Sequence, residues 1–298
     1  MNNEGHCGYV AIIGRPNVGK STLLNYLLGQ KISITSPKPQ TTRHRLLGIK
    51  TKGNHQIIYV DTPGIHQRKH NAINRYLNQV ALTSIEGVDV ILWLVEALQW
   101  TAEDNRVLNI LEKTSIPIIL GVNKVDKLKD KANLLPYLQE IYQRRSFTEI
   151  FPISAFKGQN LIELEDSIIK YLPLGVPLFP EDQITDRTER FLVAELVREK
   201  LVRRLGDELP YRLAVEIELF EAGKKLTHIA AIIWVERPGQ KAIVIGKQGG
   251  MLKIVGEEAR KEIEVLIASK VFLQLWVKVK PGWCDDERAL EQLGYAEK

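Results

Sequence analysis

The sequence predicts an α/β domain with a mostly parallel sheet and helices on both faces, followed by a smaller α+β domain. Before residue 173, short apolar runs alternate with stretches of helical period, which is typical of buried parallel strands joined by helices. This pattern stops at residues 173–180, where three prolines and a glycine within eight residues cannot continue a helix. We therefore expect a first domain at residues 1–175, a linker at 176–187 and a second domain at 188–298.

The elements of the first domain follow from apolar runs of strand length and from the helical spacing between them. The expected strands lie at residues 9–13, 56–60, 88–95, 117–122 and 150–153. The expected helices lie at residues 20–28, 74–85, 105–112 and 133–143. Strands that are apolar almost throughout are buried on both faces, so the sheet should carry helices on each side.

The second domain groups its elements differently. Its expected elements are a helix at 188–204, strands at 211–220 and 226–236, a helix at 251–268 and a strand at 271–280. Because strands and helices do not alternate regularly, we expect an α+β domain here and not a second parallel sheet.

Composition excludes several classes of protein. The chain has 298 residues, 44% hydrophobic and 26% charged, which is neither collagen-like, low-complexity nor typical of a disulfide scaffold. Cys7 and Cys284 are its only cysteines, consistent with a reducing cytosol. We expect a cytoplasmic protein, because no leader is visible and no apolar run approaches the ~18 residues of a membrane span. Residues 1–180 hold 21 Lys and Arg against 15 Asp and Glu, a net charge of +6, whereas the whole chain has a net charge of +5. The positive charge therefore does not come from a basic C-terminal tail.

A glycine-rich motif lies between the first expected strand and the helix at 20–28. The segment Gly14-Arg-Pro-Asn-Val-Gly-Lys20-Ser21 matches the pattern G-x-x-x-x-G-K-[ST]. In this pattern backbone N–H groups close on phosphates, the lysine reaches the β and γ oxygens, and the serine hydroxyl ligates Mg²⁺. A glycine-rich turn without a ligand is the alternative, which the strand and helix context disfavours. The motif predicts a nucleoside triphosphate site and does not distinguish GTP from ATP.

The segment Asn123-Lys-Val-Asp126 follows the strand at 117–122 and predicts the base specificity. A carboxylate at Asp126 can accept hydrogen bonds from the N1–H and the exocyclic amine of guanine, whereas adenine offers an acceptor there. Because a buried, unpaired carboxylate is costly, Asp126 would select GTP and reject ATP. After another apolar strand come Ser154 and Ala155, and the N–H of Ala155 could meet guanine O6.

Two further segments complete the expected nucleotide site. Asp61 ends an apolar strand and suits the role of holding the Mg²⁺ shell, while Gly64 would let backbone approach the γ-phosphate. The polar segment 31–45 contains Thr41 and Thr42, either of which could complete Mg²⁺ coordination when the γ-phosphate is present.

Together these five motifs resemble the G1 to G5 set of translation-factor-class GTPases, and the nearest resemblance is to the Era family. It covers nearly the whole chain and rests on Gly14–Thr22, Pro39-Gln-Thr-Thr-Arg-His44, Asp61-Thr-Pro-Gly-Ile65 and Arg187-Thr-Glu-Arg-Phe191. The resemblance implies a P-loop GTPase domain that hydrolyses GTP to GDP and phosphate. It also favours Thr42 over Thr41 as the Mg²⁺ ligand.

The site residues assigned in this way form three groups, and the expected cofactors are GTP or GDP and Mg²⁺. The phosphate-binding residues are Gly14, Asn17, Val18, Gly19, Lys20, Ser21, Thr22 and Gly64. The Mg²⁺ ligands are Ser21, Thr42 and Asp61. The guanine-binding residues are Asn123, Lys124, Asp126, Ser154 and Ala155.

Ile65 departs from Ras-like GTPases, which carry at this position the glutamine that orients the attacking water. Isoleucine has no hydrogen-bonding group, and the resemblance implies slow intrinsic hydrolysis. Two hypotheses supply the missing charge stabilisation: a partner acting in trans, or K⁺. By resemblance to related GTPases, Asn17 is the candidate K⁺ ligand.

The segment Gly246-Lys-Gln-Gly249 precedes the helix at 251–268. A G-x-x-G turn lets backbone approach a sugar-phosphate chain, and Lys247 adds positive charge. Alone, the motif is explained equally well by a tight turn, but residues 243–260 resemble a KH domain, and the order of elements resembles its type II form. We therefore assign RNA binding to Gly246, Lys247, Gln248 and Gly249.

The Era resemblance also implies partners, which composition and spacing do not show. These are the 3′ region of 16S rRNA and the 30S subunit, with a role in small-subunit assembly, and the protein is expected to be a monomer. Peripheral association with the cytoplasmic face of the membrane is a further expectation. The alternative is a membrane-associated regulatory GTPase whose C-terminal half is an interaction module. An RNA-modification GTPase is disfavoured, because no cofactor-binding or catalytic-cysteine pattern accompanies the motifs.

Other features receive a structural interpretation. His66 and His70 have the spacing of zinc ligands on a helix, but no nearby residue completes a set, so a polar loop is expected. Trp276 is expected in the core, whereas Trp283 is left open between contacting a base and packing the tail. A solvated face is expected for the basic residues of the helix at 188–204, with rRNA or an anionic membrane as the alternative contact. These residues are Arg190, Arg198, Lys200, Arg203 and Arg204.

Overall fold

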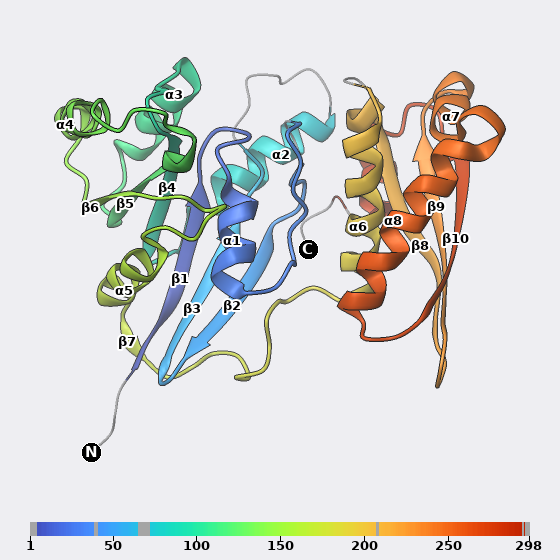
Figure 1. Ribbon diagram of the computed structural model, residues 1–298, viewed down its shortest axis with the longest axis horizontal. Helices are drawn as coiled ribbons and strands as arrows, with labels where there is room; N and C mark the ends of the chain where they lie inside the picture. The colour runs from blue at the N-terminus through green and yellow to red at the C-terminus, as the bar shows by residue number, and fades with distance from the viewer. Residues whose placement is uncertain (1–4, 39–40, 65–71, 207–208, 294, 296–298) are drawn as a thin grey trace. The chain divides into compact units, whose positions relative to one another are not determined.

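The computed structural model describes residues 5–38, 41–64, 72–206, 209–293 and 295 (Figure 1). The described residues form two compact units. The first unit holds residues 5–33, 42–64 and 77–186. The second unit holds the described residues from 187 onward, together with residues 34–38, 41 and 72–76. The second unit therefore includes short segments from the first half of the sequence.

The first unit is built on one sheet with the strand order β2-β3-β1-β4-β5-β6. Its strands are β1 (Gly5–Ile13), β2 (Leu46–Lys52), β3 (His55–Asp61), β4 (Val90–Glu96), β5 (Ile118–Asn123), β6 (Glu149–Pro152) and β7 (Leu174–Gly175). Neighbouring strands from β3 to β6 are parallel, while β2 pairs antiparallel with β3 and β7 with β1. The mostly parallel sheet predicted from the sequence is confirmed.

Helices cover this sheet, whose central strands are buried on both faces. The helices are α1 (Lys20–Leu28), α2 (Ala72–Thr83), α3 (Ala102–Leu111), α4 (Leu134–Arg144) and α5 (Leu161–Tyr171). Trp93 of β4 packs with Val107 of α3 and Ile141 of α4. Its neighbours Leu92 and Leu94 point to the other face and are equally buried. Helices α1 and α5 contact β3 and β1, respectively.

The strands β2 and β7 and the helix α5 were not predicted. Gly48 interrupts the apolar run of β2, and Lys50 and Lys52 keep part of their side chains exposed, as suits the edge of a sheet. Strand β7 is only two residues long, within the Pro-rich stretch. Short or half-polar edge strands of this kind carry weak sequence patterns.

The second unit contains a three-stranded sheet with the order β10-β9-β8. Its elements are α6 (Glu189–Arg204), β8 (Leu213–Ala222), β9 (Thr227–Val235), α7 (Pro238–Ile245), α8 (Gly250–Leu266), β10 (Val271–Val279) and α9 (Glu287–Gln292). Strand β10 is parallel to β9, and β8 is antiparallel to it. One face of the sheet packs on apolar residues of α6 and α8, such as Val197 and Ala259. The predicted α+β class is confirmed, whereas α7 and α9 were not predicted. In the described part of the chain, none of the helices combines the length and apolar character of a membrane span.

Two tryptophans have different environments. The expectation that Trp276 lies in the core is wrong, because 56% of it is exposed. It shares the outward phase of β10 with Gln274 and Lys278. Trp283 is fully buried and stacks on Tyr295, with ring centroids 6.1 Å apart. Trp283 therefore packs the C-terminal segment and does not present a surface for bases.

The solvated face expected on α6 is wrong for two of its basic residues. Arg198 and Lys200 are both buried, as is Glu199 between them. Arg190, Arg203 and Arg204 are exposed, as expected. Helix α6 thus buries charged residues as well as its apolar face, and their partners bear on function below.

Candidate functional site

The glycine-rich loop between β1 and α1 has a backbone that only glycine fits. Gly14 and Gly19 have φ angles of 148° and 106°. A Cβ on Gly19 would lie 2.4 Å from Nδ2 of Asn123, and one on Gly14 would lie 2.5 Å from the carbonyl oxygen of Leu94. Gly19 caps α1, which begins at Lys20, so the N–H groups of the first helical turn adjoin the loop. The loop has the construction of an anion cradle.

Lys20 lies over this loop. It is buried, and its Nζ donates to the carbonyl oxygens of Gly14 and Arg15, both at 3.0 Å. Burial lowers the pKa of Lys20 to about 8, against the opposing effect of Asp61. A buried ammonium held by neutral carbonyls is well suited to pair with an incoming anion.

Three of the predicted oxygen ligands converge beside Lys20. The Ser21 hydroxyl lies 2.9 Å from that of Thr42 and donates to Oδ2 of Asp61 at 3.1 Å. Asp61 is fully buried, its Oδ1 has no hydrogen-bond partner among the described residues, and burial raises the pKa of its carboxyl group. Two hydroxyls and a carboxylate with an unused oxygen fit a hard divalent cation such as Mg²⁺.

The structure distinguishes the two candidate threonines. The Thr41 hydroxyl donates to the backbone carbonyl of Lys38 at 2.7 Å, whereas Thr42 lies against Ser21. Thr42 is therefore the better-placed ligand. The structure also adds Ser33, whose hydroxyl donates to Oδ2 of Asp61 at 2.8 Å. No motif marked Ser33, because its proximity to Asp61 depends on the path of the loop.

Asn123 joins three of the predicted motifs. Its Nδ2 donates to the carbonyl of Val18 at 2.7 Å, and its Oδ1 accepts from the N–H of Ala155 at 2.9 Å. Both ends of this amide therefore bind backbone, which makes Asn123 a residue that positions the loops. The N–H of Ala155, predicted to meet guanine O6, donates to Asn123 in this structure, so its contact with guanine stays a prediction.

Asp126 and Lys124 belong to the predicted guanine site. Oδ1 of Asp126 accepts from the Ser154 hydroxyl at 2.5 Å, and the Asp126 side chain is exposed. The cost of an unpaired carboxylate therefore applies only once a base covers it. Lys124 has a left-handed backbone and pairs with Glu96 at 2.7 Å. Glu96 also binds Arg15 of the loop at 3.2 Å, a role that the sequence pattern did not reveal.

The remaining predicted residues have simpler surroundings. Asn17 is exposed with a φ of 62°, while Thr22 is half-buried in the first turn of α1. A Cβ on Gly64 would lie 3.0 Å from two atoms of Pro16, so glycine permits the close approach of these segments. Ile65, His66 and His70 lie outside the described residues.

In the second unit, the residues predicted to bind RNA form a tight turn between α7 and α8. Gly246, Gln248 and Gly249 all have positive φ angles, of 74°, 52° and 77°. A Cβ on Gly246 would lie 2.6 Å from the Cβ of Met251, so only glycine fits there. The side chains of Lys247 and Gln248 are exposed at the tip of the turn.

Comparisons with known proteins agree with this geometry. The model of a family described as 50S ribosome-binding GTPase matches residues 9–124, and that of the KH domain matches residues 208–284. The GTPase Era of Azotobacter vinelandii is 57% identical over 293 residues, which cover 98% of each chain. That of Marinobacter nauticus is 54% identical, covering 99% of this chain and 97% of its own. This chain belongs to the Era family. It is therefore a GTPase with a C-terminal KH domain.

Solved structures of Era extend the similarity to the whole fold. Era crystallised with MgGDPNP and nucleotides 1506–1542 of 16S ribosomal RNA is 45% identical, with a TM-score of 0.95, over 98% of this chain and all of that one. A point variant of Aquifex aeolicus Era bound to GDP·AlF₄⁻ is 44% identical, with a TM-score of 0.94 and the same coverage.

Proposed function

We propose that this Era family member binds GTP with Mg²⁺ in its first unit and the 3′ region of 16S rRNA through its KH turn, acting in assembly of the 30S subunit in the cytoplasm. The proposal of GTP and Mg²⁺ binding rests on the convergence of Ser21, Thr42 and Asp61 beside Lys20. The RNA part rests on the G-x-x-G turn and on similarity to the Era protein crystallised with 16S rRNA nucleotides. We keep the boundaries 1–175 and 188–298 for the two functional domains.

The chain's own residues divide the work on the triphosphate. Lys20 and the N–H groups of the loop would hold the phosphates, with Gly64 admitting backbone at the γ position. Ser21, Thr42 and Asp61 would hold Mg²⁺, which when bound neutralises charge on the phosphate oxygens. Because Thr42 would contribute only when the γ-phosphate is present, loss of that phosphate would release its segment. A partner in trans or K⁺ at Asn17 remains our proposal for faster hydrolysis.

The second unit offers a surface suited to a single RNA strand. The turn exposes Lys247 and brings backbone to the surface, while Ile243 of α7 and Ile254 of α8 are 55% and 41% exposed. Exposed apolar side chains beside a G-x-x-G turn can contact RNA bases while the sugar-phosphate backbone of the RNA lies against the turn. The family model with the large-subunit description matches only residues 9–124, so our choice of the small subunit rests on similarity to the Era protein crystallised with nucleotides of 16S ribosomal RNA.

A change at Asp126 tests the guanine assignment. Replacing Asp126 with Asn exchanges an acceptor for a donor, so we expect GTP to bind at least about tenfold more weakly and xanthosine triphosphate to bind more tightly than GTP. Fluorescence competition between the two nucleotides measures this preference.

The matched control is Asp130→Asn, in the same loop. Asp130 is exposed and accepts a hydrogen bond from the N–H of Ala132, so it should retain the preference for GTP. If Asp126→Asn also prefers GTP, the residue does not read the base.

A further inference from the structure

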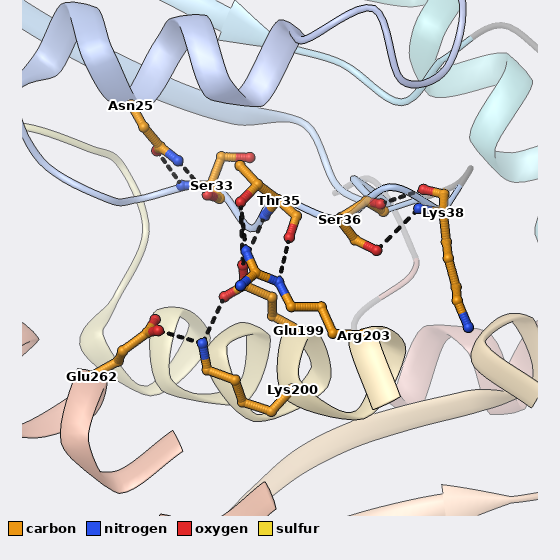
Figure 2. Close-up of polar contacts among 10 residues, drawn as sticks. Asn25, Ser33, Thr35, Ser36, Lys38, Glu199, Lys200, Arg203 and Glu262 are labelled. Atoms are coloured by element: carbon orange, nitrogen blue, oxygen red, sulfur yellow. Dashed lines mark hydrogen bonds and ion pairs between the residues drawn. The ribbon is translucent and has the colours of Figure 1, made fainter. Parts of the chain in front are cut away.

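A segment of the second unit, residues 34–38 and 41, is attached to α6 by polar contacts. Figure 2 shows Thr35 facing Glu199 and Arg203 of that helix. Oε1 of Glu199 accepts from the N–H of Thr35 at 3.2 Å and from its hydroxyl at 3.3 Å. Arg203 donates to the carbonyl of Thr35 at 3.0 Å and to its hydroxyl at 2.9 Å. Every polar group of Thr35 is thus held by two side chains of α6.

The buried Glu199 and its ion pairs with other charged residues strengthen this attachment. Glu199 is fully buried and pairs with Arg203 at 2.6 Å and with Lys200 at 3.5 Å. Lys200 in turn pairs with Glu262 of α8 (Figure 2). A buried carboxylate is tolerated only while its partners surround it, so withdrawing Thr35 would leave Glu199 short of two donors.

Two more contacts hold the segment farther along. Nζ of Lys38 donates to the carbonyl of Leu205, just after α6, and Arg198 donates to the carbonyl of Thr41. Arg198 is itself buried and fixed by two hydrogen bonds to Glu195, at 2.7 and 2.6 Å. The segment is therefore anchored at three positions to the C-terminal half of α6 and to Leu205.

The residues that flank the segment on either side make contacts in the proposed Mg²⁺ site. Ser33, immediately before it, donates to Asp61 at 2.8 Å. Thr42, immediately after it, lies 2.9 Å from Ser21. Since one peptide bond separates Thr41 from Thr42, the anchorage on α6 limits where the Thr42 hydroxyl can lie.

We propose that Glu199 and Arg203 are positioning residues for the GTPase reaction, which hold residues 34–38 and 41 on α6 so that Thr42 is available to the Mg²⁺ site in the triphosphate state. This proposal rests on the proposed function of Thr42. Its signature is selective, because Thr42 serves the γ-phosphate state and not the diphosphate state. Loosening the anchor should therefore weaken binding of GTP and leave binding of GDP unchanged.

Glu199→Gln tests the proposal in the full-length protein with Mg²⁺. Glutamine keeps the size of the side chain but loses the charge that holds Arg203 and the Thr35 donors. We expect the Kd for the non-hydrolysable analogue GDPNP to rise about tenfold, and the Kd for GDP to stay within about twofold of wild type. Without nucleotide or Mg²⁺, amide hydrogen exchange at Thr35 should become faster. Equal weakening of both nucleotides, or no weakening of either, would overturn the proposal.

The matched control is Glu258→Gln, which makes the same change in a carboxylate paired with Arg204, also on α6. It should leave both Kd values and the exchange at Thr35 unchanged. If Glu199→Gln fails to fold, Thr35→Ala and Thr35→Ser decide: alanine should weaken GDPNP selectively and serine, which keeps the hydroxyl, should restore it. Failure of the wild-type protein to bind either nucleotide would instead refute the proposed function.

Discussion

Replacing Lys20 with Ala is expected to lower kcat/KM for GTP about 1000-fold. Lys20 is buried over the glycine-rich loop with its Nζ fixed by two carbonyls, so no other side chain can take its place without moving the loop. Loss of a charged donor costs affinity for the phosphates and, to a larger extent, stabilisation of charge that develops during transfer. Phosphate release assays at varied GTP concentration measure the change.

Lys52→Ala is the control for this variant. Lys52 lies on β2 and pairs with Asp166 of α5 at 2.8 Å, in a half-exposed position outside the loop. A partly exposed ion pair contributes little, so this variant should keep the wild-type rate and nearly the wild-type stability. A Lys20→Ala protein that is folded and hydrolyses GTP at the rate of Lys52→Ala would contradict the role given to Lys20.

Introducing Asp at both Gly246 and Gly249 is expected to reduce RNA affinity at least about 100-fold, to the level of non-specific binding. Each substitution adds a negative charge where the backbone would adjoin phosphates. Both glycines have positive φ angles, and a Cβ at Gly246 would press on Met251, so the turn must also deform. Fluorescence anisotropy with a labelled RNA strand at fixed salt gives the affinity.

The control variant adds the same two negative charges elsewhere in the second unit. Gly239, near the start of α7, and Gly282 both have open space where a Cβ would lie, and Gly282 also has a positive φ angle. Gly239→Asp with Gly282→Asp should therefore bind RNA within a few-fold of wild type. Circular dichroism melting establishes that both double variants fold. If the two bind RNA equally well, the turn is not the RNA contact.

The nucleotide motifs were predictable because the loops that carry them follow buried strands. Asp61 and Asn123 are the last residues of parallel strands, and Lys20 ends the loop that follows another. Parallel strands bring these ends to one edge of the sheet. Ser33 and Glu96 were missed for the opposite reason. Their positions depend on the path of a loop and on a pairing with Arg15, which no local pattern encodes.

The charged residues of α6 show a second limit. Arg198, Glu199 and Lys200 are consecutive, so they point in different directions around the helix. Because charged side chains are rarely buried, the local sequence predicts that they are exposed to solvent. Arg198 and Glu199 bind Thr41 and Thr35, more than 150 residues earlier in the chain, and Lys200 pairs with Glu262 of α8. Trp276 is different, because the alternation of β10 places it in phase with Lys278, and that pattern could have predicted its exposure.

We propose that one chain combines a GTP site with recognition of the 3′ region of 16S rRNA. The most direct test measures the affinity of the full-length protein, with Mg²⁺ and GDPNP, for an RNA of the sequence 1506–1542 crystallised with Era. A shuffled RNA of the same length and composition is the comparison. We predict that the 16S sequence binds at least about 100-fold more tightly at the same salt concentration. Equal affinity for the two RNAs would contradict the claim.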